Sequence, residues 1–472
     1  MRIKNFKKKD LELFTIISNI SDKLGVQSYV VGGYVRDLLL DLPNDDIDIV
    51  VIGKGIQLAQ EFGKKVGSGV QVFRNFGTAK VNWSNLEVEF VGARKESYDR
   101  GSRKPIVEDG TLEDDLTRRD FTINAMAISL GKNNFGELID LFGGLDHLDS
   151  KTIKTPTDPN ITFSDDPLRM LRCIRFATRL GFLINKETFD AIKENRTRLE
   201  IISAERISSE LNKILMSFDP KRGIDLLMNS GLLELILPEL SILNDSGGEG
   251  IEHHKNNYWH STVVLENVAK RSDNIWLRWA ALLHDIGKEP CKRFIDGVGW
   301  TFHNHEYIGT AMVEKIFRRL KLPLDDKLDY VKKMVNLHMR PSLMSTEEIT
   351  DSAVRRLLFD AGDDFEDLMI LCESDLTTKN DDKKKRILDH FVQLRNMVDD
   401  LRAKDYKRLF QPCLNGNDIM NLLKINKGRN IGILKNFIKD AVLDGRVDNT
   451  KESLTKLLFD KAAELGIIDQ AP

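Results

Sequence analysis

Residues 31–51 read VGGYVRDLLLDLPNDDIDIVV, and this stretch decides the fold of the first part of the chain. After a glycine pair it reaches an isoleucine- and valine-rich run that carries Asp46 and Asp48. Because side chains alternate along a strand, both carboxylates lie on one face, while Ile47 and Ile49 lie on the other. The pattern therefore predicts a strand with one acidic face and one buried face.

The same stretch offers the groups that hold phosphates and metal ions. Gly32 and Gly33 let the backbone approach phosphate oxygens closely, and Arg36 supplies a fork of donors. Two aligned carboxylates in an apolar strand are costly unless a cation shares them. Asp46 and Asp48 therefore predict a two-metal site for nucleotidyl transfer, although each feature alone also fits an ordinary turn or a solvated strand edge.

Bulk properties limit the class of protein. The 472 residues are enough for about three domains, and a net charge of −3 gives no overall basic field, so any nucleic-acid surface must be local. Four scattered cysteines without zinc spacing favour a reducing cytosol. There is neither a signal peptide nor an apolar run long enough to span a bilayer. We therefore expect a cytoplasmic protein with no membrane partner.

The sequence predicts an α/β head followed by a mainly helical body. Runs of strand-forming residues with turn signals between them cover residues 28–31, 46–52, 70–74, 79–83 and 88–92. Residues 98–116 are polar, contain glycine and mix both charges, so they predict a mobile loop beside the acidic strand. Amphipathic helices broken by Gly and Pro turns follow beyond residue 160.

A second polar motif follows that loop, in residues 116–127. Arg118 and Arg119 adjoin Asp120, and Asn124 lies one helical turn further on. Paired arginines neutralise triphosphate charge, while Asp and Asn side chains hydrogen-bond sugar hydroxyls. A salt-bridge cluster on the surface is the alternative explanation of this motif by itself.

A third motif opens a helix after Phe163. Asp165 and Asp166 stand at its start, and Arg169 and Arg172 step along one face. Acidic residues at a helix start are ordinarily caps and dipole partners. Here Asp166 and Arg169, one turn apart, also offer an acceptor and donors in the pattern of a base edge, which predicts selection of bases by hydrogen bonds.

Together these motifs resemble the tRNA nucleotidyltransferases and their poly(A) polymerase relatives. The quoted pattern is Gly-Gly-x-Val-Arg-Asp with Asp-x-Asp, then Arg-Arg-Asp-Phe-Thr-Ile-Asn-Ala, then Asp-Asp-x-x-Arg. The resemblance extends over most of residues 24–215, and the segments that agree between the motifs are Phe76–Ala79, Ile139–Leu145 and Ser203–Ile207 with Glu210. One departure is Asp165, where the family often has Glu, so the reach of this carboxylate is shorter by one methylene.

The resemblance implies roles for individual residues. Asp46 and Asp48 would hold Mg²⁺ as catalytic residues, with Glu89 as the third carboxylate and Glu87 as the alternative on the same strand face. The implied nucleotide-binding residues, which contact phosphates and ribose and read the base, are Gly32, Gly33, Arg36, Asp37, Arg118, Arg119, Asp120, Asn124, Asp165, Asp166, Arg169 and Arg172.

Histidine and aspartate residues recur through the helical body, and imidazole and carboxylate ligands suit a divalent metal. Lone histidines on helices are usually packing or surface residues, but this set resembles the HD phosphohydrolase domain. The resemblance implies His260, His284, Asp285 and Asp375 as metal ligands, and His305 and His338 as ligands for a second ion. Some relatives carry such a domain with phosphatase or phosphodiesterase activity.

The domain organisation that follows has four parts. They are a nucleotidyltransferase head with a polymerase β-like palm (1–155), a helical neck for base and tRNA binding (156–245), an HD domain (246–400) and a helical tail (401–472). In the tail, glycine turns that open helices expose backbone N–H groups, and the resemblance implies contact with tRNA there. Ordinary helix punctuation is the alternative explanation of these turns.

The resemblance implies template-independent addition of C, C and A to tRNA 3′ ends from CTP and ATP. The loop of residues 98–116 would help to move the site from C to A specificity. The nearest alternative is a poly(A) polymerase or an enzyme that adds A alone. An alternative of another class is a metal-dependent phosphohydrolase whose head merely binds nucleotides.

Overall fold

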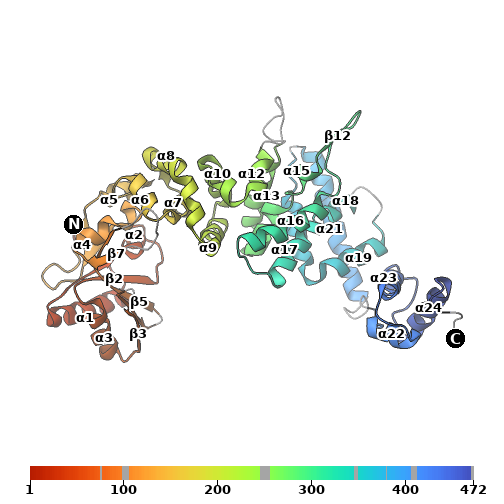
Figure 1. Ribbon diagram of the computed structural model, residues 1–472, viewed down its shortest axis with the longest axis horizontal. Helices are drawn as coiled ribbons and strands as arrows, with labels where there is room; N and C mark the ends of the chain where they lie inside the picture. The colour runs from red at the N-terminus through yellow and green to blue at the C-terminus, as the bar shows by residue number, and fades with distance from the viewer. Residues whose placement is uncertain are drawn as a thin grey trace. The chain divides into compact units, whose positions relative to one another are not determined.

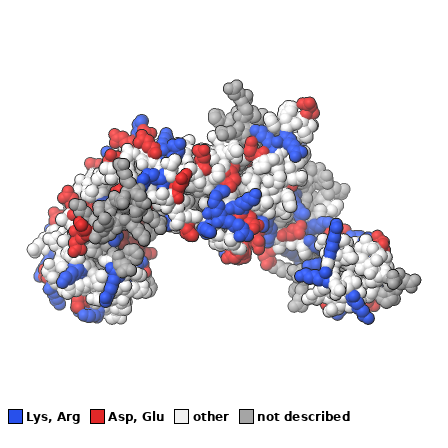
Figure 2. Space-filling view, viewed as in Figure 1, with Lys and Arg blue, Asp and Glu red and all other residues white. Residues whose placement is uncertain are grey.

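The computed structural model describes residues 1–74, 77–84, 86–97, 106–244, 256–344, 349–378, 380–404 and 412–468. The chain forms two compact units, Met1–Pro238 and Glu239–Pro472. The first is a mixed sheet with helices and the second is mostly helical, as the sequence predicts (Figure 1). On the face shown in Figure 2, basic and acidic side chains are interspersed, in keeping with the small net charge.

Seven described strands form the sheet of the head, in the order β3-β4-β5-β2-β1-β8-β9. Their bounds are β1 Gln27–Val31, β2 Asp46–Ile52, β3 Val70–Phe73, β4 Thr78–Trp83, β5 Leu86–Gly92, β8 Met126–Ser129 and β9 Leu138–Asp140. Strand β2 pairs parallel to β5 and antiparallel to β1, so the acidic strand lies near the middle of the sheet.

Helices cover one face of this sheet. They are α1 (Lys8–Leu24) and α3 (Gly55–Val66), which pack on each other and on the strands. Phe62 of α3 stacks against Phe90 of β5 with ring centroids 5.5 Å apart, and Phe90 is in register with the fully buried Ile49. Because Ile49 points towards α3, the carboxylates that alternate with it point to the opposite face.

The prediction of a loop over residues 98–116 is wrong in part. Strands β6 (Arg94–Ser97) and β7 (Ile106–Asp109) pair as an antiparallel hairpin, and helix α4 covers Leu112–Thr117. A capping box begins α4: the Thr111 side chain accepts from the Asp114 backbone, and the Asp114 side chain accepts from Thr111. Thr111 and Asp114 are thus a helix-start signal that the prediction of a loop did not take into account. Residues 98–105, like Phe76 in the predicted turn, lie outside the described residues.

Helix α7 (Leu168–Leu180) is the centre of the helical part of the first unit. It packs on α9 and α10, and Phe176 meets Phe121 edge to face at 5.8 Å, beside the 3₁₀ turn η2 (Thr122–Asn124). The remaining elements are α2 Gly33–Leu39, α5 Gly144–Asp149, α6 Pro159–Asp165, α8 Lys186–Asn195, η3 Arg196–Ile201, α9 Ala204–Leu215, α10 Pro220–Ser230, α11 Leu232–Ile236, and the short parallel pair β10 Thr152–Ile153 and β11 Leu183–Ile184.

The second unit packs its helices around Trp279, which is fully buried. Trp279 contacts Phe317 with ring centroids 6.2 Å apart, which joins α14 to α16. The elements are α12 Pro238–Ser241, η4 Ile242–Asn244, α13 Asn257–Ala269, α14 Ile275–Leu283, α15 Lys288–Cys291, β12 Arg293–Ile295, β13 Gly299–Thr301, α16 His305–Arg319, α17 Asp326–Leu337, α18 Met339–Met344, α19 Asp351–Ala361, η6 Gly362–Asp364, α20 Phe365–Ser374 and α21 Asp381–Lys404.

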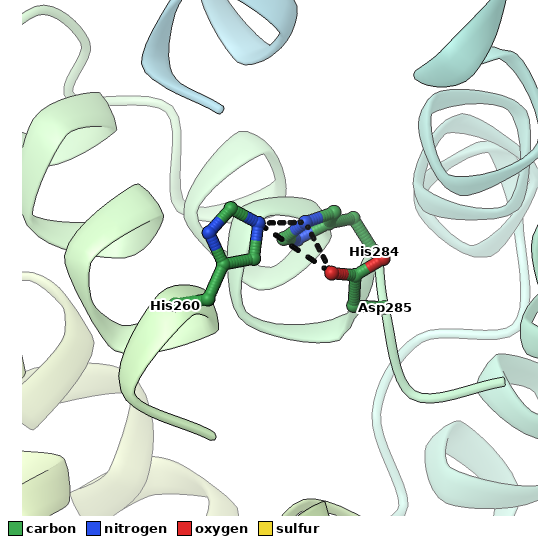
Figure 3. Close-up of side chains that lie close together, drawn as sticks. All are labelled: His260, His284 and Asp285. Carbon is green, nitrogen blue, oxygen red and sulfur yellow. Dashed lines mark hydrogen bonds and ion pairs between the residues drawn. The ribbon is translucent and has the colours of Figure 1, made fainter. Parts of the chain in front are cut away.

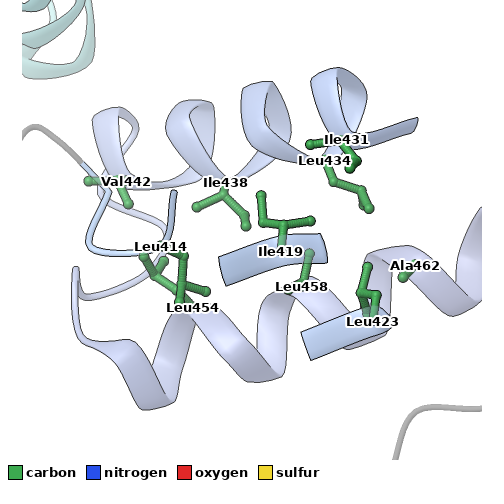
Figure 4. Close-up of a cluster of buried hydrophobic side chains, with 10 residues drawn as sticks. All are labelled: Leu414, Ile419, Leu423, Ile431, Leu434, Ile438, Val442, Leu454, Leu458 and Ala462. Carbon is green, nitrogen blue, oxygen red and sulfur yellow. The ribbon is translucent and has the colours of Figure 1, made fainter. Parts of the chain in front are cut away.

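The tail is a bundle of three described helices with its own core (Figure 4). The helices are α22 Gly416–Leu423, α23 Arg429–Leu443 and α24 Lys451–Glu464. Ile419, Leu434 and Leu458 from the three helices point into this core and are fully buried. Among all described residues, no helix is both long and apolar enough to cross a membrane.

Candidate functional site

The chain turns sharply between β1 and α2, at Gly32. Its φ of +73° is in the left-handed region that favours glycine. A Cβ at this position would lie 2.6 Å from Nη1 of Arg119, so the arginine occupies the space that a side chain would need. Gly32 therefore brings the first and second motifs together, and its predicted contact with phosphate stays a prediction.

Four carboxylates share the face of the sheet opposite α3, where Val31 and Val50 also pack with Leu116 of α4. Asp46 is in register with Glu87, and Asp48 is in register with Glu89. Burial raises the pKa of Asp48 to about 6; Arg119 opposes this rise, while the nearby Asp46 and Glu89 add to it. The face thus concentrates negative charge that a divalent cation would offset, and the residues fit the predicted metal site.

Glu87 and Glu89 differ in their surroundings. Lys80 of β4 lies 2.6 Å from Glu87 and 3.9 Å from Glu89. Glu87 lines the cleft described below, whereas Glu89 is the one that acts on the pKa of Asp48. Since Lys80 neutralises Glu87 more directly, Glu89 is the better candidate for the third carboxylate.

A buried chain of hydrogen bonds joins the three motifs. Arg36 donates to Asp37 at 2.8 Å and to Asn124 at 2.6 Å, and Asn124 donates to Asp120 at 2.9 Å. Arg172 of α7 completes the chain with bonds of 2.8 and 2.6 Å to Asp120. Burial favours a raised pKa for Asp120, but Arg172 and Asn124 outweigh it and hold the pKa at about 2. These residues therefore fasten α2, η2 and α7 to one another.

Asp115 supports the arginines of the second motif and was not among the predicted site residues. It is fully buried and forms ion pairs with both Arg118 and Arg119, the latter at 3.0 Å. Burial favours a raised pKa for Asp115, but the two guanidinium groups outweigh it and lower the pKa. The spacing of three and four residues on a helix was the available signal. Asp115 orients the arginines predicted to bind the triphosphate.

The predicted base-reading residues lie where α6 meets α7. Asp166 accepts from the backbone N–H of Leu168 at 3.2 Å and is 3.3 Å from Arg206 of α9. Arg169 donates to the carbonyl of Arg118 at 2.6 Å, which links the second motif to the third. Arg206, in the segment Ser203–Ile207, was not predicted as a site residue. From helix α9, Arg206 contacts the Asp166 carboxylate and helps to fix its position.

One cleft of about 920 Å³ gathers most of these groups. Its lining includes Gly33, Arg36, Asp37, Asp46, Asp48, Glu87, Arg118, Arg119, Asp120, Asn124, Asp166, Arg169, Arg172, Arg175, Phe176, Arg179, Arg206 and Lys213. Three predicted site residues, Gly32, Glu89 and Asp165, are beside this lining and are not part of it. Acidic residues on the sheet and basic residues on the helices thus line a single space.

The predicted ligands of the helical body also come together. His260 and His284 place their Nε2 atoms 3.3 Å apart, and the same atoms lie 3.5 and 3.2 Å from Oδ2 of Asp285 (Figure 3). Asp375 completes the group, with Oδ1 2.8 Å from His260 and 3.6 Å from His284. These positions come from α13 and from the ends of α14 and α20, far apart in the sequence.

A second group uses the other oxygen of Asp285. His305 and His338 place Nε2 at 3.3 and 3.9 Å from Oδ1, and their own Nε2 atoms are 3.3 Å apart. Both groups have the composition and spacing to hold a metal ion. Asp285 is therefore placed to bridge two ions.

Hydrogen bonds outside the cluster fix the orientation of each imidazole. Nδ1 of His284 faces the carbonyl of Ala281 at 2.9 Å, and Nδ1 of His338 faces that of Val335 at 2.7 Å. Nδ1 of His305 faces the carbonyl of Phe302 at 3.0 Å in the same way. A carbonyl only accepts, so these Nδ1 atoms carry a proton, and Nε2 is the atom through which each ring would bind a metal ion in place of a second proton.

The electrostatics of the cluster favour a cation. Burial favours a low pKa for His284, but Asp285 and Asp375 outweigh it and raise the pKa to about 10. By contrast, burial and the neighbouring His284 lower the pKa of His338 to about 4. Lys288, which was not predicted, lies 2.5 Å from Asp285. A divalent ion would supply the positive charge that these carboxylates now draw from His284 and Lys288.

Family models match three successive parts of the chain. A poly(A) polymerase head domain matches residues 28–154, a probable RNA-binding site of polymerase A matches 181–243, and an HD domain matches 253–403. Fold and matches together place the chain in the class of proteins that join a nucleotidyltransferase head to an HD domain.

Curated relatives define the family more closely. The chain is 32% identical over 364 residues to the multifunctional CCA protein of Tolumonas auensis, covering 74% of this chain and 84% of that protein. It is 30% identical over 437 residues to the CCA-adding enzyme of Geobacillus sp., covering 92% and 93%. The chain therefore belongs to the family of tRNA nucleotidyltransferases and poly(A) polymerases.

Other relatives are named for a narrower activity. The A-adding tRNA nucleotidyltransferase of Geobacter sulfurreducens is 40% identical over 228 residues, which cover 48% of this chain and 26% of that protein. For the A-adding enzyme of Aquifex aeolicus the identity is 33%, with 65% and 36% covered. The chain thus spans only about a quarter to a third of the length of these two relatives.

Solved structures share the fold. A tRNA nucleotidyltransferase complexed with a primer tRNA and an incoming ATP analogue superposes with a TM-score of 0.58 at 26% identity, covering 81% of this chain and 99% of that chain. The Thermotoga maritima CCA-adding enzyme complexed with tRNA gives a TM-score of 0.60 at 23% identity, covering 97% of each chain.

Proposed function

We propose that this protein adds C, C and A to the 3′ end of tRNA without a template, using CTP and ATP. The observation that carries the proposal is the single cleft in which Asp46 and Asp48 face Asp166 and Arg169. The choice of CCA over A alone is supported by the relatives that match over most of their own length, which are named for CCA addition. We further propose that it acts in the cytoplasm on tRNA.

In the proposed reaction the terminal 3′ oxygen of tRNA forms a bond to the α-phosphorus. The bond from that phosphorus to the bridging oxygen breaks, pyrophosphate leaves, and the hydroxyl proton passes to solvent. Asp46, Asp48 and Glu89 would hold Mg²⁺, which supplies charge stabilisation for the phosphoryl group. Arg118 and Arg119, oriented by Asp115, neutralise the triphosphate.

Base selection is assigned to Asp166 and Arg169. Cytosine and adenine both carry an exocyclic amino group beside a ring-nitrogen acceptor on their pairing edge. The Asp166 carboxylate accepts from the amino group and Arg169 donates to the ring nitrogen. Uracil and guanine present a carbonyl oxygen in place of the amino group, which the carboxylate repels. Arg206 supports the proposal because it fixes the Asp166 carboxylate at 3.3 Å.

Products resolved at single-nucleotide length test this function. Purified protein is incubated with Mg²⁺ and tRNA that ends at the discriminator base, with CTP and ATP supplied separately and together. We expect two additions with CTP alone and a third when ATP is also present. An A tail with ATP alone would instead assign the protein to poly(A) addition.

We propose a second activity, metal-dependent phosphoester hydrolysis, in the HD domain. The supporting observation is the Asp285 carboxylate, whose two oxygens face two separate histidine groups. Water oxygen would bond to phosphorus while the ester oxygen leaves with a proton. Asp46→Ala separates the two activities, because it should abolish nucleotide addition and leave the release of p-nitrophenol from bis(p-nitrophenyl) phosphate unchanged.

We also propose a function for each part of the chain. The proposal assigns nucleotide chemistry to residues 1–155, base and tRNA binding to 156–245, hydrolysis to 246–400 and tRNA contact to 401–472. The family matches that end at 154 and begin at 181 and 253 support these assignments.

A further inference from the structure

The aromatic ring of Phe176 lies among the cationic groups of the cleft in the first unit. The guanidinium carbon of Arg175 is 4.3 Å from the ring centroid, and those of Arg36 and Arg172 are 5.0 and 5.4 Å away. Phe176 is 4% exposed, and it lines the cleft beside these three side chains. One buried ring is therefore shared by three arginines.

The three arginines come from different parts of the fold and have different acidic or amide partners. Arg36 of α2 donates to Asn124 of η2 at 2.6 Å. Arg172 and Arg175 stand one turn apart on α7, and Nε of Arg175 is 2.8 Å from Glu210 of α9. The ring is thus in contact with groups that connect α2, η2, α7 and α9.

The like charges of these arginines oppose one another. Burial lowers the pKa of Arg175 to about 10; Glu210 opposes this fall, and the charge of Arg172 adds to it. Burial also lowers the pKa of Arg36, and the charge of Arg179 adds to that fall. The face of an aromatic ring carries negative charge density and attracts cations. The ring therefore offsets part of a repulsion that would otherwise push the guanidinium groups apart.

A ring and a carboxylate restrain an arginine in different ways. A carboxylate engages the N–H donors and cancels the positive charge of the group. A ring engages the flat face of the guanidinium, carries no net charge, and leaves the N–H donors at the edge for another partner. Phe176 therefore restrains cations of the cleft without using the donors and the charge that a triphosphate requires.

We propose that Phe176 is a positioning residue for nucleotide addition, whose ring holds Arg36, Arg172 and Arg175 in place for the incoming nucleoside triphosphate. The inference rests on the nucleotide addition proposed above and adds the residue that orders the cationic side of its site. Because the arginines are ordered before the nucleotide arrives, less conformational freedom is lost on binding. Weakening the attraction of the ring for cations should therefore affect nucleotide binding more than kcat.

Fluorination of the ring tests this role, because each fluorine withdraws negative charge from the aromatic face with little change in ring size. The full-length protein is prepared with phenylalanine, 4-fluorophenylalanine or 3,4,5-trifluorophenylalanine at position 176. Calorimetry in the presence of Mg²⁺ measures binding of a CTP analogue with an unreactive methylene bridge between the α- and β-phosphorus. We expect the affinity to fall with each step of fluorination, by about fivefold for the trifluoro ring, which is the strength of one cation–π contact.

Two further variants separate charge distribution from packing. Phe176→Leu keeps an apolar side chain without an aromatic face, and we expect it to weaken binding as the trifluoro ring does. Trifluorophenylalanine at Phe62, a fully buried ring that packs on Phe90, is the matched control and should leave the affinity unchanged. Thermal unfolding of each protein shows that it is folded. In primer extension, the KM for CTP should rise in parallel with the loss of affinity, while kcat changes much less.

The outcomes separate this inference from the proposed function. If Phe176→Leu weakens binding but fluorination does not, the ring acts by packing alone and the inference is disproved. If the wild-type protein extends tRNA and all the fluorinated proteins bind the analogue equally well, the inference is disproved and nucleotide addition stands. If the affinity falls with fluorination at position 176 but no tRNA is extended, the positioning of the arginines for a nucleoside triphosphate is supported and nucleotide addition is disproved.

Discussion

Arg172 donates from both Nε and Nη2 to one oxygen of Asp120, at 2.8 and 2.6 Å. The pair connects helix α7 to the motif that follows α4, within the buried network of the cleft. Removing one partner of a buried charge pair leaves the other uncompensated. We therefore expect Arg172→Met to lower the free energy of unfolding by about 2 kcal/mol. Thermal unfolding measures this, and Arg179→Met, at an exposed position of the same helix, is the control. Equal losses in the two variants would contradict the assignment.

Asp120 also predicts a dependence of stability on pH. Its pKa in the folded protein, about 2, is below the ordinary value of 3.8. The stabilisation is therefore complete above about pH 5 and is lost as the pH falls through 3.8 towards 2, because the unfolded chain takes up the proton first. Urea unfolding of the protein and of Asp120→Asn at pH 5, 4 and 3 measures the effect. We expect the wild-type protein to lose about 1 kcal/mol more than the variant over this range. Parallel losses would show that other carboxylates control acid stability.

The two glutamates of β5 are distinguishable by activity. The charge of Glu89 helps to raise the pKa of Asp48, while Glu87 lies 2.6 Å from Lys80. We expect Glu89→Gln to lower nucleotide addition at least about tenfold and Glu87→Gln to change it much less, since loss of a metal-site carboxylate has that effect. The reverse order would assign the third carboxylate to Glu87. Primer extension under single-turnover conditions, with Mg²⁺ varied, gives both rates and shows whether the defect is one of metal affinity.

Asp166 should control which base is accepted. Its carboxylate is held by Arg206 at 3.3 Å and lines the cleft. We expect Asp166→Ala to lower the ratio of kcat/KM for CTP over that for UTP at least about tenfold, because the variant no longer repels the uracil carbonyl. Asp158→Ala, at the cap of α6, is the control for a general disturbance of this region. An unchanged ratio with a lower overall rate would show that Asp166 only maintains the structure.

The shared carboxylate of the HD cluster predicts how metal content changes. One oxygen of Asp285 lies beside His284, and the other lies beside His305 and His338. Asp285 is therefore shared by the two groups, whereas each histidine belongs to one group. Mass spectrometry of the purified protein should find one bound ion fewer in His305→Ala, and two fewer in Asp285→Ala, than in the wild-type protein. The exposed His303→Ala is the matched control and should keep both. An equal loss in the His305 and Asp285 variants would indicate a single ion.

The acidic strand was predictable because its pattern is local. Alternation alone placed Asp46 and Asp48 opposite Ile47 and Ile49, and the burial of β2 follows this order. The resemblance to the HD domain also predicts the histidine and aspartate residues that the structure brings together. That Asp285 faces both groups depends on how four helices pack, which spacing in the sequence does not contain.

The failures have physical causes as well. The polar composition of residues 98–116 concealed the strand Ile106–Asp109 and helix α4, because charged residues on a hairpin and a capped short helix look like a loop. Arg36 is predicted to contact phosphate; in the structure it lines the cleft and donates to Asp37 and Asn124, so its contact with phosphate stays a prediction. An arginine in a motif reveals its charge but not its partner, so internal bonding and ligand binding look the same in a sequence.

The deep burial of His338 and Asp285 affects how long a bound metal ion would stay in the protein. His338 and Asp285 are almost completely covered, and the more exposed His260 and Asp375 lie in front of them. An ion held by Asp285, His305 and His338 would exchange with solvent more slowly than one beside His260 and Asp375, because its ligands are more deeply buried. Such a molecule would keep the ion with which it folded long after the surrounding solution has changed.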